Sequence, residues 1–516
     1  MAAAAEEEAF SHLEATGSVL GDDPPRTHRI NANSFQQSAL LTVNGWQYAA
    51  FYQAKEGAEN SHICYPTLAR RLLRSWPTGS DGAWEYLIFY DYEQTFDDGH
   101  NTISIGVCIG DGTIHVSYDH HCDTLRYRHS VQGLATKPEE FEWEKEHFSE
   151  TSRGLPGLST CKMMEEVSYP RFISADQDMA GSGSDVLYRY SSTTHGYTFL
   201  GTILTGEGNS PYINGMDYRA NCLHVSWTYR KFVGYEGVHD PTSTAHKAQA
   251  GPNGPENNYK LCFMYSEDRG VSWNDSGGRK IADLESGQTV KPTTEGIVVF
   301  DIPTNSGILN QEAQCVAPDG EFHVLNREKH EDVETWILYS RHPADLWKRN
   351  PIKGFSPTET GSRGSICSDK DSNIYAILPG NIDSSLTIMQ ALKQEGYLNF
   401  KTVWRQDGFD GEPLVDQARL DEQNVLSIFT RTDEDEEGKR RVVVIDIDLG
   451  GPEEYPYGMQ LASEHDEARA QEIEQAENEE LRAKSAGCAG SISDSDSAEK
   501  KRDLRSPSRN DEVGVT

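Results

Sequence analysis

The chain of 516 residues is 36% hydrophobic and carries a formal net charge of -35 at pH 7. This acidic balance argues against nucleic acid as a partner, because phosphate binding needs clustered Lys and Arg. The sequence holds no apolar run that approaches the ~18 residues needed to span a bilayer, so we expect no membrane partner either.

The N-terminal region, residues 1–34, is rich in Ala and Glu and then irregular, and we interpret it as a mostly irregular extension. It begins MAAAAEEEAF, without the basic and apolar regions of a secretory signal. The nine cysteines are scattered without a CxxC spacing, which is typical of a reducing compartment. The sequence as written therefore predicts a cytoplasmic protein, and an extracellular one if its N-terminus is incomplete.

Residues 35–451 show the pattern of an all-β fold. Short alternating runs are bounded by Gly, Asp, Asn and Pro. The runs at 319–327, 372–380 and 423–431 recur with a period of about fifty residues, as four-stranded propeller blades do. Counted this way, the region holds seven blades, and we predict a seven-bladed β-propeller. A β-sandwich and a pair of separate domains are the alternatives.

One hairpin of this region, DDGHNTISIGVCIGDGTIHVSYDHH (97–121), carries the strongest functional signal. Its Asp-Gly turn predicts strands over 102–108 and 113–119, in which the numbers of facing residues add up to about 220 or 221. The residues gathered at the open end are His100, Asn101, His120 and His121, flanked by Asp97, Asp98 and Asp119. Such clusters usually perform chemistry or hold a metal. The alternative is that these histidines have only a structural role, with their hydrogen bonds satisfied at the edge of a blade.

Two further segments complete the organisation. The run 266–273, SEDRGVSW, resembles an Asp-box turn, in which Asp and Gly close a hairpin and Trp packs between blades, and we assign it a structural role. Residues 452–516 are charged and of low complexity, which predicts a largely disordered tail with a helix over 461–484.

Several segments, taken in order, resemble the BNR-repeat-containing family of seven-bladed propellers, which includes the ulvan lyases and the fungal-type L-rhamnose-α-1,4-D-glucuronate lyases. Besides the histidine hairpin they are VSYPRF (167–172), SPYINGMDY (210–218), LHVSWTYR (223–230), NQEAQ (310–314), SRGSICSDKDSNIYAILPG (362–380) and GEPLVDQARL (411–420). The resemblance covers residues 35–450. It departs from the family between Met179 and Ala180, where a short segment with an arginine near the substrate is missing. A wrong gene model, a different substrate or an inactive homologue would each explain this.

The resemblance implies a lyase that cleaves a glycosidic bond to a uronic acid by β-elimination, of the rhamnosyl-glucuronate type. The reaction must neutralise the C5 carboxylate, remove the C5 proton and protonate the oxygen that leaves C4. Histidine and arginine suit the first task, and tyrosine or histidine the other two. The expected partner is a uronic-acid-containing oligo- or polysaccharide, bound by a monomer. No cofactor is required, a structural Ca²⁺ or Zn²⁺ is compatible with the family, and the metal ligands are unknown.

Carried onto this sequence, the resemblance predicts a set of site residues. The catalytic candidates are His100, His120, Tyr169 and Arg230. The substrate-binding candidates are Asn101, His121, Asn214, Gln311, Arg327 and Arg363. His121 ranks below His120, because successive side chains of a strand point to opposite faces. For most of these residues a structural role, in strand-end packing, a surface ion pair or a turn between blades, is the alternative.

Two other functions stay open. A sialidase-like glycoside hydrolase shares the propeller and the Asp box, but it needs three convergent arginines and a Tyr/Glu nucleophile pair that the sequence does not assemble. A non-catalytic propeller that binds carbohydrate or protein would explain the segment missing from the family pattern.

Overall fold

The structure, a computed structural model, describes residues 13–450 apart from 56–62, 74–80, 159–163, 176–177, 184–185, 235–253, 343, 345, 359–360 and 381–383. The chain divides into two compact units, Met1–Gly451 and Pro452–Thr516. The second unit, with the predicted tail and its helix over 461–484, lies outside the described residues.

Short antiparallel strands form seven sheets in the first unit. The first sheet consists of β2 (Leu40–Val43), β3 (Trp46–Ala54), β4 (Cys64–Leu72) and β5 (Glu85–Ile88). The second consists of β6 (Ile103–Cys108), β7 (Thr113–Tyr118) and β8 (Tyr127–His129). The third consists of β9 (Arg171–Ala175), β10 (Asp178–Gly183), β11 (Val186–Ser191) and β12 (Gly196–Thr202). The fourth is β13 (Asn209–Arg219), β14 (Cys222–Lys231), β15 (Asn258–Ser266), β16 (Ser272–Asn274) and β17 (Lys280–Asp283), with β18 (Val298–Phe300) paired to β15.

The fifth sheet consists of β19 (Ala313–Val316), β20 (Phe322–His330), β21 (Val333–Arg341) and β22 (Lys348–Pro351). The sixth consists of β23 (Ser365–Ser368), β24 (Ile374–Pro379), β25 (Leu386–Ala391) and β26 (Phe400–Gln406). The last consists of β27 (Leu414–Val415), β28 (Val425–Arg431), β29 (Arg441–Asp448) and β1 (Ala15–Asp22). The described helices are α1 (Gln417–Gln423) and the 3-10 turns η1 (Ser34–Gln36), η2 (Pro138–Glu140), η3 (Lys145–His147), η5 (Pro255–Asn257) and η6 (Lys393–Glu395). None of these helices is long and apolar enough to cross a membrane.

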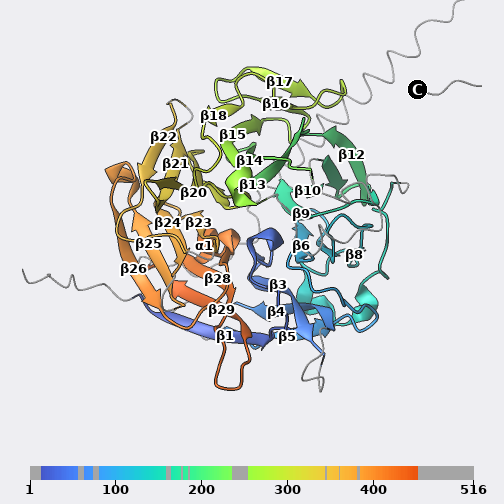
Figure 1. Cartoon of the computed structure of the whole chain (residues 1–516). Helices are drawn as coiled ribbons and strands as arrows, with labels where there is room; N and C mark the ends of the chain where they lie inside the picture. Colours follow the sequence, from blue (N-terminus) through green and yellow to red (C-terminus); the bar gives the residue numbers. More distant parts are fainter. Residues whose placement is uncertain are drawn as a thin grey trace, which may run out of the picture. The chain divides into compact units, whose positions relative to one another are not determined.

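The sheets of this unit follow one another in chain order around a common centre (Figure 1). Their first strands lie side by side: β2 contacts β6, β6 contacts β9, and the series continues through β13, β19, β23 and β27. Antiparallel sheets arranged radially in this way are the architecture of a β-propeller. The prediction of an all-β propeller is confirmed.

The number of complete blades differs from the prediction. Six sheets have four strands or more, whereas the sheet β6–β8 has three. After β8 the chain runs through η2 and η3, and isolated bridges of Tyr127 with Ser152 and of Ser130 with Phe148 take the place of a fourth strand. The prediction of seven four-stranded blades was therefore wrong, and the structure has six complete blades and one three-stranded sheet.

The N-terminal segment closes the ring. Strand β1 pairs antiparallel with β29, from Ala15 opposite Ile447 to Asp22 opposite Arg441, and becomes the outer strand of the last sheet. The expected irregular extension over 1–34 is thus wrong for residues 15–22. The exposed edge of β29 offers unpaired backbone N–H and C=O groups, which β1 satisfies although its own sequence has little alternation.

A buried ion network reinforces the closure between the last and first sheets. Asp446 on β29 accepts hydrogen bonds from Arg71 of β4 at 2.6 Å and from Arg419 of α1 at 2.7 Å. Asp81 pairs with the same two guanidinium groups, at 3.6 Å from Arg71 and 2.7 Å from Arg419. Because the two arginines and Asp446 are all at least nine-tenths buried, the charges compensate one another inside the protein.

Asp446→Ala is expected to lower the free energy of unfolding by about 3–5 kcal/mol, because two buried guanidinium groups would then share the carboxylate of Asp81 alone. Chemical denaturation followed by tryptophan fluorescence measures the change. Asp448→Ala is the matched control: its carboxylate accepts the N–H of Gly450 at 3.1 Å at the end of the same strand, and we expect a loss of about 1 kcal/mol or less. Equal losses for the two variants would contradict the closing role of Asp446.

The predicted Asp-box turn at 266–273 and the departure from the family pattern at 179–180 both lie in sheets of at least four strands. Asp268 accepts the Ser272 N–H and the Ser266 hydroxyl, both at 2.8 Å, and Trp273 is fully buried, as expected of an Asp-box turn. In the third sheet, Arg171 to Ala175 of β9 pairs directly with β10, and four strands are present. The departure from the family pattern at 179–180 therefore leaves a sheet of four strands.

Candidate active site

The register of the histidine hairpin decides which rings meet. Ile103 lies opposite Tyr118 and Cys108 opposite Thr113, so the numbers of facing residues add up to 221. The Asp119 N–H continues the pattern by donating to the Thr102 carbonyl at 3.2 Å. A change of one residue in register moves a side chain to the other face. The sum of 221 places His100 opposite His121, not opposite His120.

His100 and His121 share one carboxylate. Their Nδ1 atoms lie 2.5 Å and 2.6 Å from the two oxygens of Asp98, whose side chain is fully buried. The two imidazole rings are stacked with centroids 4.1 Å apart. A neutral imidazole whose Nδ1–H donates to a carboxylate carries its lone pair on Nε2, where a proton can be accepted.

The charges of this cluster are coupled. Burial alone raises the pKa of Asp98, but the hydrogen bonds from His100 and His121 outweigh it and hold the pKa below its ordinary value. Burial lowers the pKa of His100, although its bond to Asp98 acts in the opposite direction. The resting cluster is therefore an ionised carboxylate with His100 neutral at pH 7, the form that can act as a base.

His120 lies outside the cluster, contrary to the prediction. It is fully buried, and its Nε2 accepts the backbone N–H of Arg126 at 2.6 Å. Burial lowers the pKa of His120 to about 3, so the ring is neutral and structural. The predicted ranking of the two histidines was wrong, because the hairpin pairs in the register of 221 and turns His121 toward the partner ring.

Tyr169 faces both histidines. Its ring centroid lies 5.8 Å from that of His100, 6.3 Å from that of His121 and 5.3 Å from that of Phe35. Tyr169 precedes Pro170 and has a φ of 53°, a conformation that is unfavourable for a residue before proline. Strained backbone of this kind concentrates at functional sites.

A cavity of about 240 Å³ opens beside these rings. Its walls include His121, Cys122, Tyr169, Arg171, Tyr212 and Gln311. Cys122 and Gln311 also have positive φ angles, of 50° and 54°. Burial, and the neighbouring Tyr212, raise the pKa of Tyr169 well above its ordinary value, while Arg230 lowers it. Tyr169 therefore presents a protonated hydroxyl to the cavity.

Arg230 and Arg363 each stack on an aromatic side chain next to this group. Arg230, at the end of β14, donates to the Tyr212 hydroxyl and stacks over the Tyr212 ring at 4.3 Å. Arg363 donates from Nε to the Asn310 carbonyl at 2.7 Å and stacks over Phe35 at 4.8 Å. Phe35 in turn stacks on His100, with ring centroids 5.0 Å apart and planes inclined by 13°.

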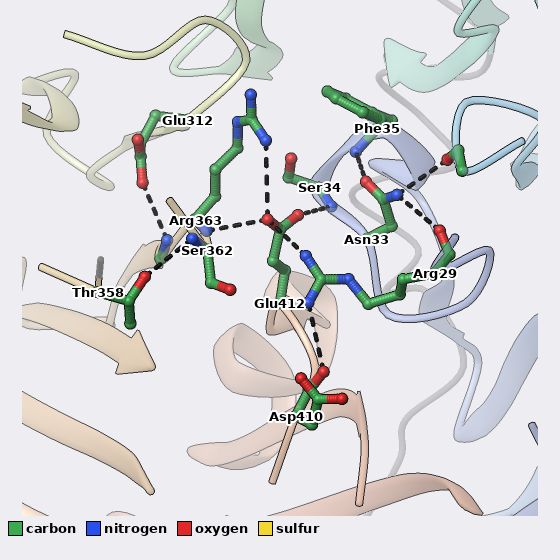
Figure 2. A network of polar contacts seen from close by, with 12 residues as sticks. Arg29, Asn33, Ser34, Phe35, Glu312, Thr358, Ser362, Arg363, Asp410 and Glu412 are labelled. Atoms are coloured by element: carbon green, nitrogen blue, oxygen red, sulfur yellow. Dashed lines mark hydrogen bonds and ion pairs between the residues drawn. The ribbon is translucent and has the colours of Figure 1, made fainter. Parts of the chain in front are cut away.

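A polar network holds Phe35 in this place (Figure 2). Glu412 accepts the Ser34 N–H at 2.6 Å and the Arg363 N–H at 3.0 Å, and it pairs with Arg29 at 2.7 Å. Burial alone raises the pKa of Glu412, but Arg29 and Arg363 lower it below its ordinary value. The ionised Glu412 thus ties the N-terminal turn η1, which carries Phe35, to the loop before β23.

Three predicted substrate contacts have hydrogen-bond or ion-pair partners within the protein. Asn101 donates to Asp119 at 2.8 Å, and Asn214 donates to Ser226 at 3.2 Å. Arg327 is 1% exposed and pairs with Glu312 at 2.9 Å. None of the three lines the 240 Å³ cavity, whereas the predicted residues His121 and Gln311 do.

Sequence reasoning missed several residues of this site. Phe35, Tyr212 and Arg171 lie on three different blades or loops, and only the last two belong to quoted segments, SPYINGMDY and VSYPRF. The sequence placed Asp98 only beside the histidines, and in the structure it hydrogen-bonds two of them. No local signal marks Phe35, because its partners are far away in the sequence.

The same cluster has the donor groups of a metal centre. Asp98, His100 and His121 each offer a donor atom, and these atoms lie within 4.8 Å of one another. Without an ion, the Nδ1 atoms lie 2.5 and 2.6 Å from the carboxylate oxygens, as hydrogen-bond partners do. In this state the cluster has the arrangement of an acid–base group.

Comparisons with known proteins add the family. A model described as "BNR repeat-containing family member" matches residues 46–354, more than half of the chain. The solved structure of the polysaccharide lyase Uly1 is 15% identical with a TM-score of 0.61, covering 87% of this chain and 94% of that one. A PL25 ulvan lyase bound to -[GlcA(1-4)Rha3S]- is 14% identical with a TM-score of 0.56, covering 80% and 93%. No functionally curated protein matches the sequence. These identities show a shared fold, and the match over 46–354 shows that the chain belongs to the BNR repeat-containing family.

Proposed function

We propose that this protein is a lyase that cleaves the glycosidic bond to a uronic acid by β-elimination. One observation carries the proposal: two histidines share the buried Asp98, and both of their rings face the hydroxyl-bearing ring of Tyr169 beside a cavity. This geometry supplies a proton acceptor and a proton donor on one side of a bound sugar. The shared fold with proteins named polysaccharide lyases supports the proposal.

The proposed reaction uses the protonation states described above. An imidazole Nε2 of His100 or His121 takes the C5 proton, the C5–H electron pair forms the C4=C5 double bond, and the C4–O bond breaks. Tyr169 donates its proton to the departing oxygen. In glucuronate the C5 hydrogen and the C4 oxygen lie on the same ring face, so groups on one wall of the cavity can serve both steps. Proton transfers of this kind contribute about 10²–10⁴-fold each.

The substrate class we favour is a rhamnosyl-glucuronate oligo- or polysaccharide. The family resemblance includes rhamnose–glucuronate lyases, and one structure of the same fold is described as bound to a glucuronic acid linked 1-4 to a sulfated rhamnose. The ligand is that protein's, and it motivates the choice of test substrate here.

The test uses rhamnose-capped glucuronides as substrate. Elimination creates a 4,5-unsaturated uronate, which absorbs near the ultraviolet edge, so absorbance and released sugar are followed together. Equal growth of the two signals is the expected result. Sugar release without the chromophore would mean hydrolysis, and no release with measurable binding would mean a binding propeller.

The pH dependence of kcat/KM follows from the base. Because burial lowers the pKa of His100, we expect the acid limb of the profile to lie below the ordinary histidine value of about 6.5. The carboxylate of Asp98 raises the pKa of His100, so Asp98→Asn should move the limb to lower pH and also reduce the plateau rate. An acid limb above pH 6.5 in the unmodified protein would contradict His100 as the base.

The hydrolase alternative has weaker support in the described cavity. A sialidase-like mechanism needs a carboxylate paired with its tyrosine nucleophile. No Asp or Glu is among the described residues that line the 240 Å³ cavity next to Tyr169.

A further inference from the structure

Asp119 lies directly after β7, two residues before His121. The residue is 8% exposed and has a φ of 63°, so the chain leaves the extended conformation of the strand here. Asp tolerates this left-handed conformation better than most residues do. The N–H of Asp119 donates to the Thr102 carbonyl at 3.2 Å, and its carbonyl accepts Nη1 of Arg126 at 2.5 Å. The direction in which the chain approaches His121 is therefore fixed at Asp119.

The carboxylate of Asp119 accepts hydrogen bonds from three side chains. Its Oδ1 accepts Nε2 of Gln94 at 2.9 Å and Nδ2 of Asn101 at 2.8 Å. Its Oδ2 accepts the hydroxyl of Tyr92. Tyr92 and Gln94 precede the segment 98–100, and Asn101 follows it. One carboxylate thus joins both flanks of this segment to the end of β7.

The segments joined in this way carry the whole acid–base cluster. Asp98 and His100 belong to the segment 98–100, and His121 follows the end of β7. The cluster depends on short contacts, because the Nδ1 atoms lie 2.5 and 2.6 Å from the Asp98 oxygens and the ring centroids are 4.1 Å apart. A small displacement of one strand end against the other would therefore break at least one of these hydrogen bonds.

Gln94 anchors this arrangement to the first sheet. The residue is fully buried, and its Nε2 also donates to the Phe96 carbonyl at 2.8 Å. Its backbone N–H and carbonyl pair with Cys64 of β4 at 2.9 and 3.0 Å. The carboxylate of Asp119 is therefore held against a strand of the neighbouring blade. Asp119 is not among the described residues that line the 240 Å³ cavity, so its effect on the imidazoles passes through the chain segments that it joins.

We propose that Asp119 is the positioning residue of the acid–base cluster. It holds the segments that carry Asp98, His100 and His121 together, so that both rings stay hydrogen-bonded to one carboxylate. The kinetic part of this inference rests on the proposed function, and it adds a group that acts on the reaction without touching the sugar.

The first experiment removes the shared acceptor with Asp119→Ala. We expect kcat for uronate elimination to fall about 10²-fold, the cost of a displacement of about 1 Å at a reacting group, while KM changes about twofold or less. Asp119→Asn should recover most of the rate. Its Oδ1 can still accept Gln94 and Asn101, and the Tyr92 hydroxyl can rotate to accept from the new amide.

A double-mutant cycle tests whether Asp119 acts through the cluster. In the Asp98→Asn background, Asp119→Ala should lower kcat by about threefold or less, because the geometry that it maintains is already lost. Asp119→Ala also leaves buried amide groups without an acceptor, which destabilises the protein. Asn101→Ala, which removes a single donor of the three, is therefore measured as well, and we expect a loss in kcat of about tenfold.

The second experiment does not need turnover. Heteronuclear NMR of the full chain, labelled at histidine and kept in alkaline buffer, shows which ring nitrogen carries the proton. The signals of His100 and His121 are assigned from His100→Gln and His121→Gln. We expect both rings to carry the proton on Nδ1 in the unmodified protein and in Asp119→Asn, and to lose these Nδ1–H signals in Asp119→Ala.

Asp91→Ala is the matched control. Asp91 lies one position before Tyr92, and its carboxylate accepts Nη2 of Arg128 at 2.5 Å and pairs with Lys145 at 3.0 Å. The variant thus removes a carboxylate with several partners from the same segment. We expect its kcat per folded protein and its Nδ1–H signals to match those of the unmodified protein.

The outcomes separate this inference from the proposed function. An unchanged kcat in Asp119→Ala, an equal loss in the Asp98→Asn background, or equal effects of Asp91→Ala and Asp119→Ala would each overturn the inference. A protein that releases no unsaturated uronate refutes the lyase, and loss of the Nδ1–H signals in Asp119→Ala alone then still supports the positioning role. Elimination with Nδ1–H signals that persist in Asp119→Ala does the reverse.

Discussion

His121→Ala is expected to lower the rate of uronate elimination by about 10²–10⁴-fold, the range for losing a general acid or base. His121 shares Asp98 with His100 and lines the cavity beside Tyr169. Its removal leaves Asp98 with a single imidazole partner and takes away one wall of the site. The measurement is the initial rate of chromophore formation per milligram of folded protein, with circular dichroism to confirm the fold.

His120→Ala is the matched control for this variant. The ring of His120 is fully buried and accepts the Arg126 N–H, so its loss should cost about 1–3 kcal/mol of stability and leave the rate of the folded protein nearly unchanged. If His120→Ala abolished elimination while His121→Ala did not, the pairing of His100 with His121 would not be the functional one.

Tyr169→Phe is expected to reduce elimination by a similar factor, about 10²–10⁴-fold, while binding of a uronoside changes little. Phenylalanine keeps the ring that contacts Phe35 and the histidines, and only the proton donor is lost. Single-turnover rates and calorimetric binding constants separate the two effects.

Tyr190→Phe serves as the control, on β11 of the sheet whose first strand begins two residues after Tyr169. Its hydroxyl donates to Asp111 at 2.8 Å, and the residue does not line the 240 Å³ cavity. We expect unchanged elimination for this variant. A loss of binding in Tyr169→Phe that equals its loss of rate would show that the hydroxyl holds the sugar and does not transfer a proton.

The sequence predicted the local features of the site well. The Asp-Gly turn and its flanking alternation predicted the hairpin of β6 and β7, and with it the gathering of histidines at one open end. These features are set by hydrogen bonds between residues close in sequence, which a periodic pattern records directly. The same patterns predicted a propeller. They did not predict that the β6–β8 sheet has isolated bridges in place of a fourth strand.

The sequence could not choose between His120 and His121. The two alternatives, sums of 220 and 221, differ by a single residue of register, and the turn alone does not distinguish them. The paired strands settle the question at 221. The same limit applies to β1, whose pairing depends on the free edge of β29 more than on its own residues.

What the sequence determined by itself was the β-rich repeat, the histidine hairpin and the position of Tyr169 in a family-like segment. The tertiary structure alone decided that Asp98 joins His100 to His121, that Phe35 stacks on His100, and that Glu412 holds the turn that carries Phe35. The physical reason is that burial and charge compensation depend on blades that are distant in the chain. Local hydrogen bonding can be read along a sequence, whereas the packing of one blade against another cannot.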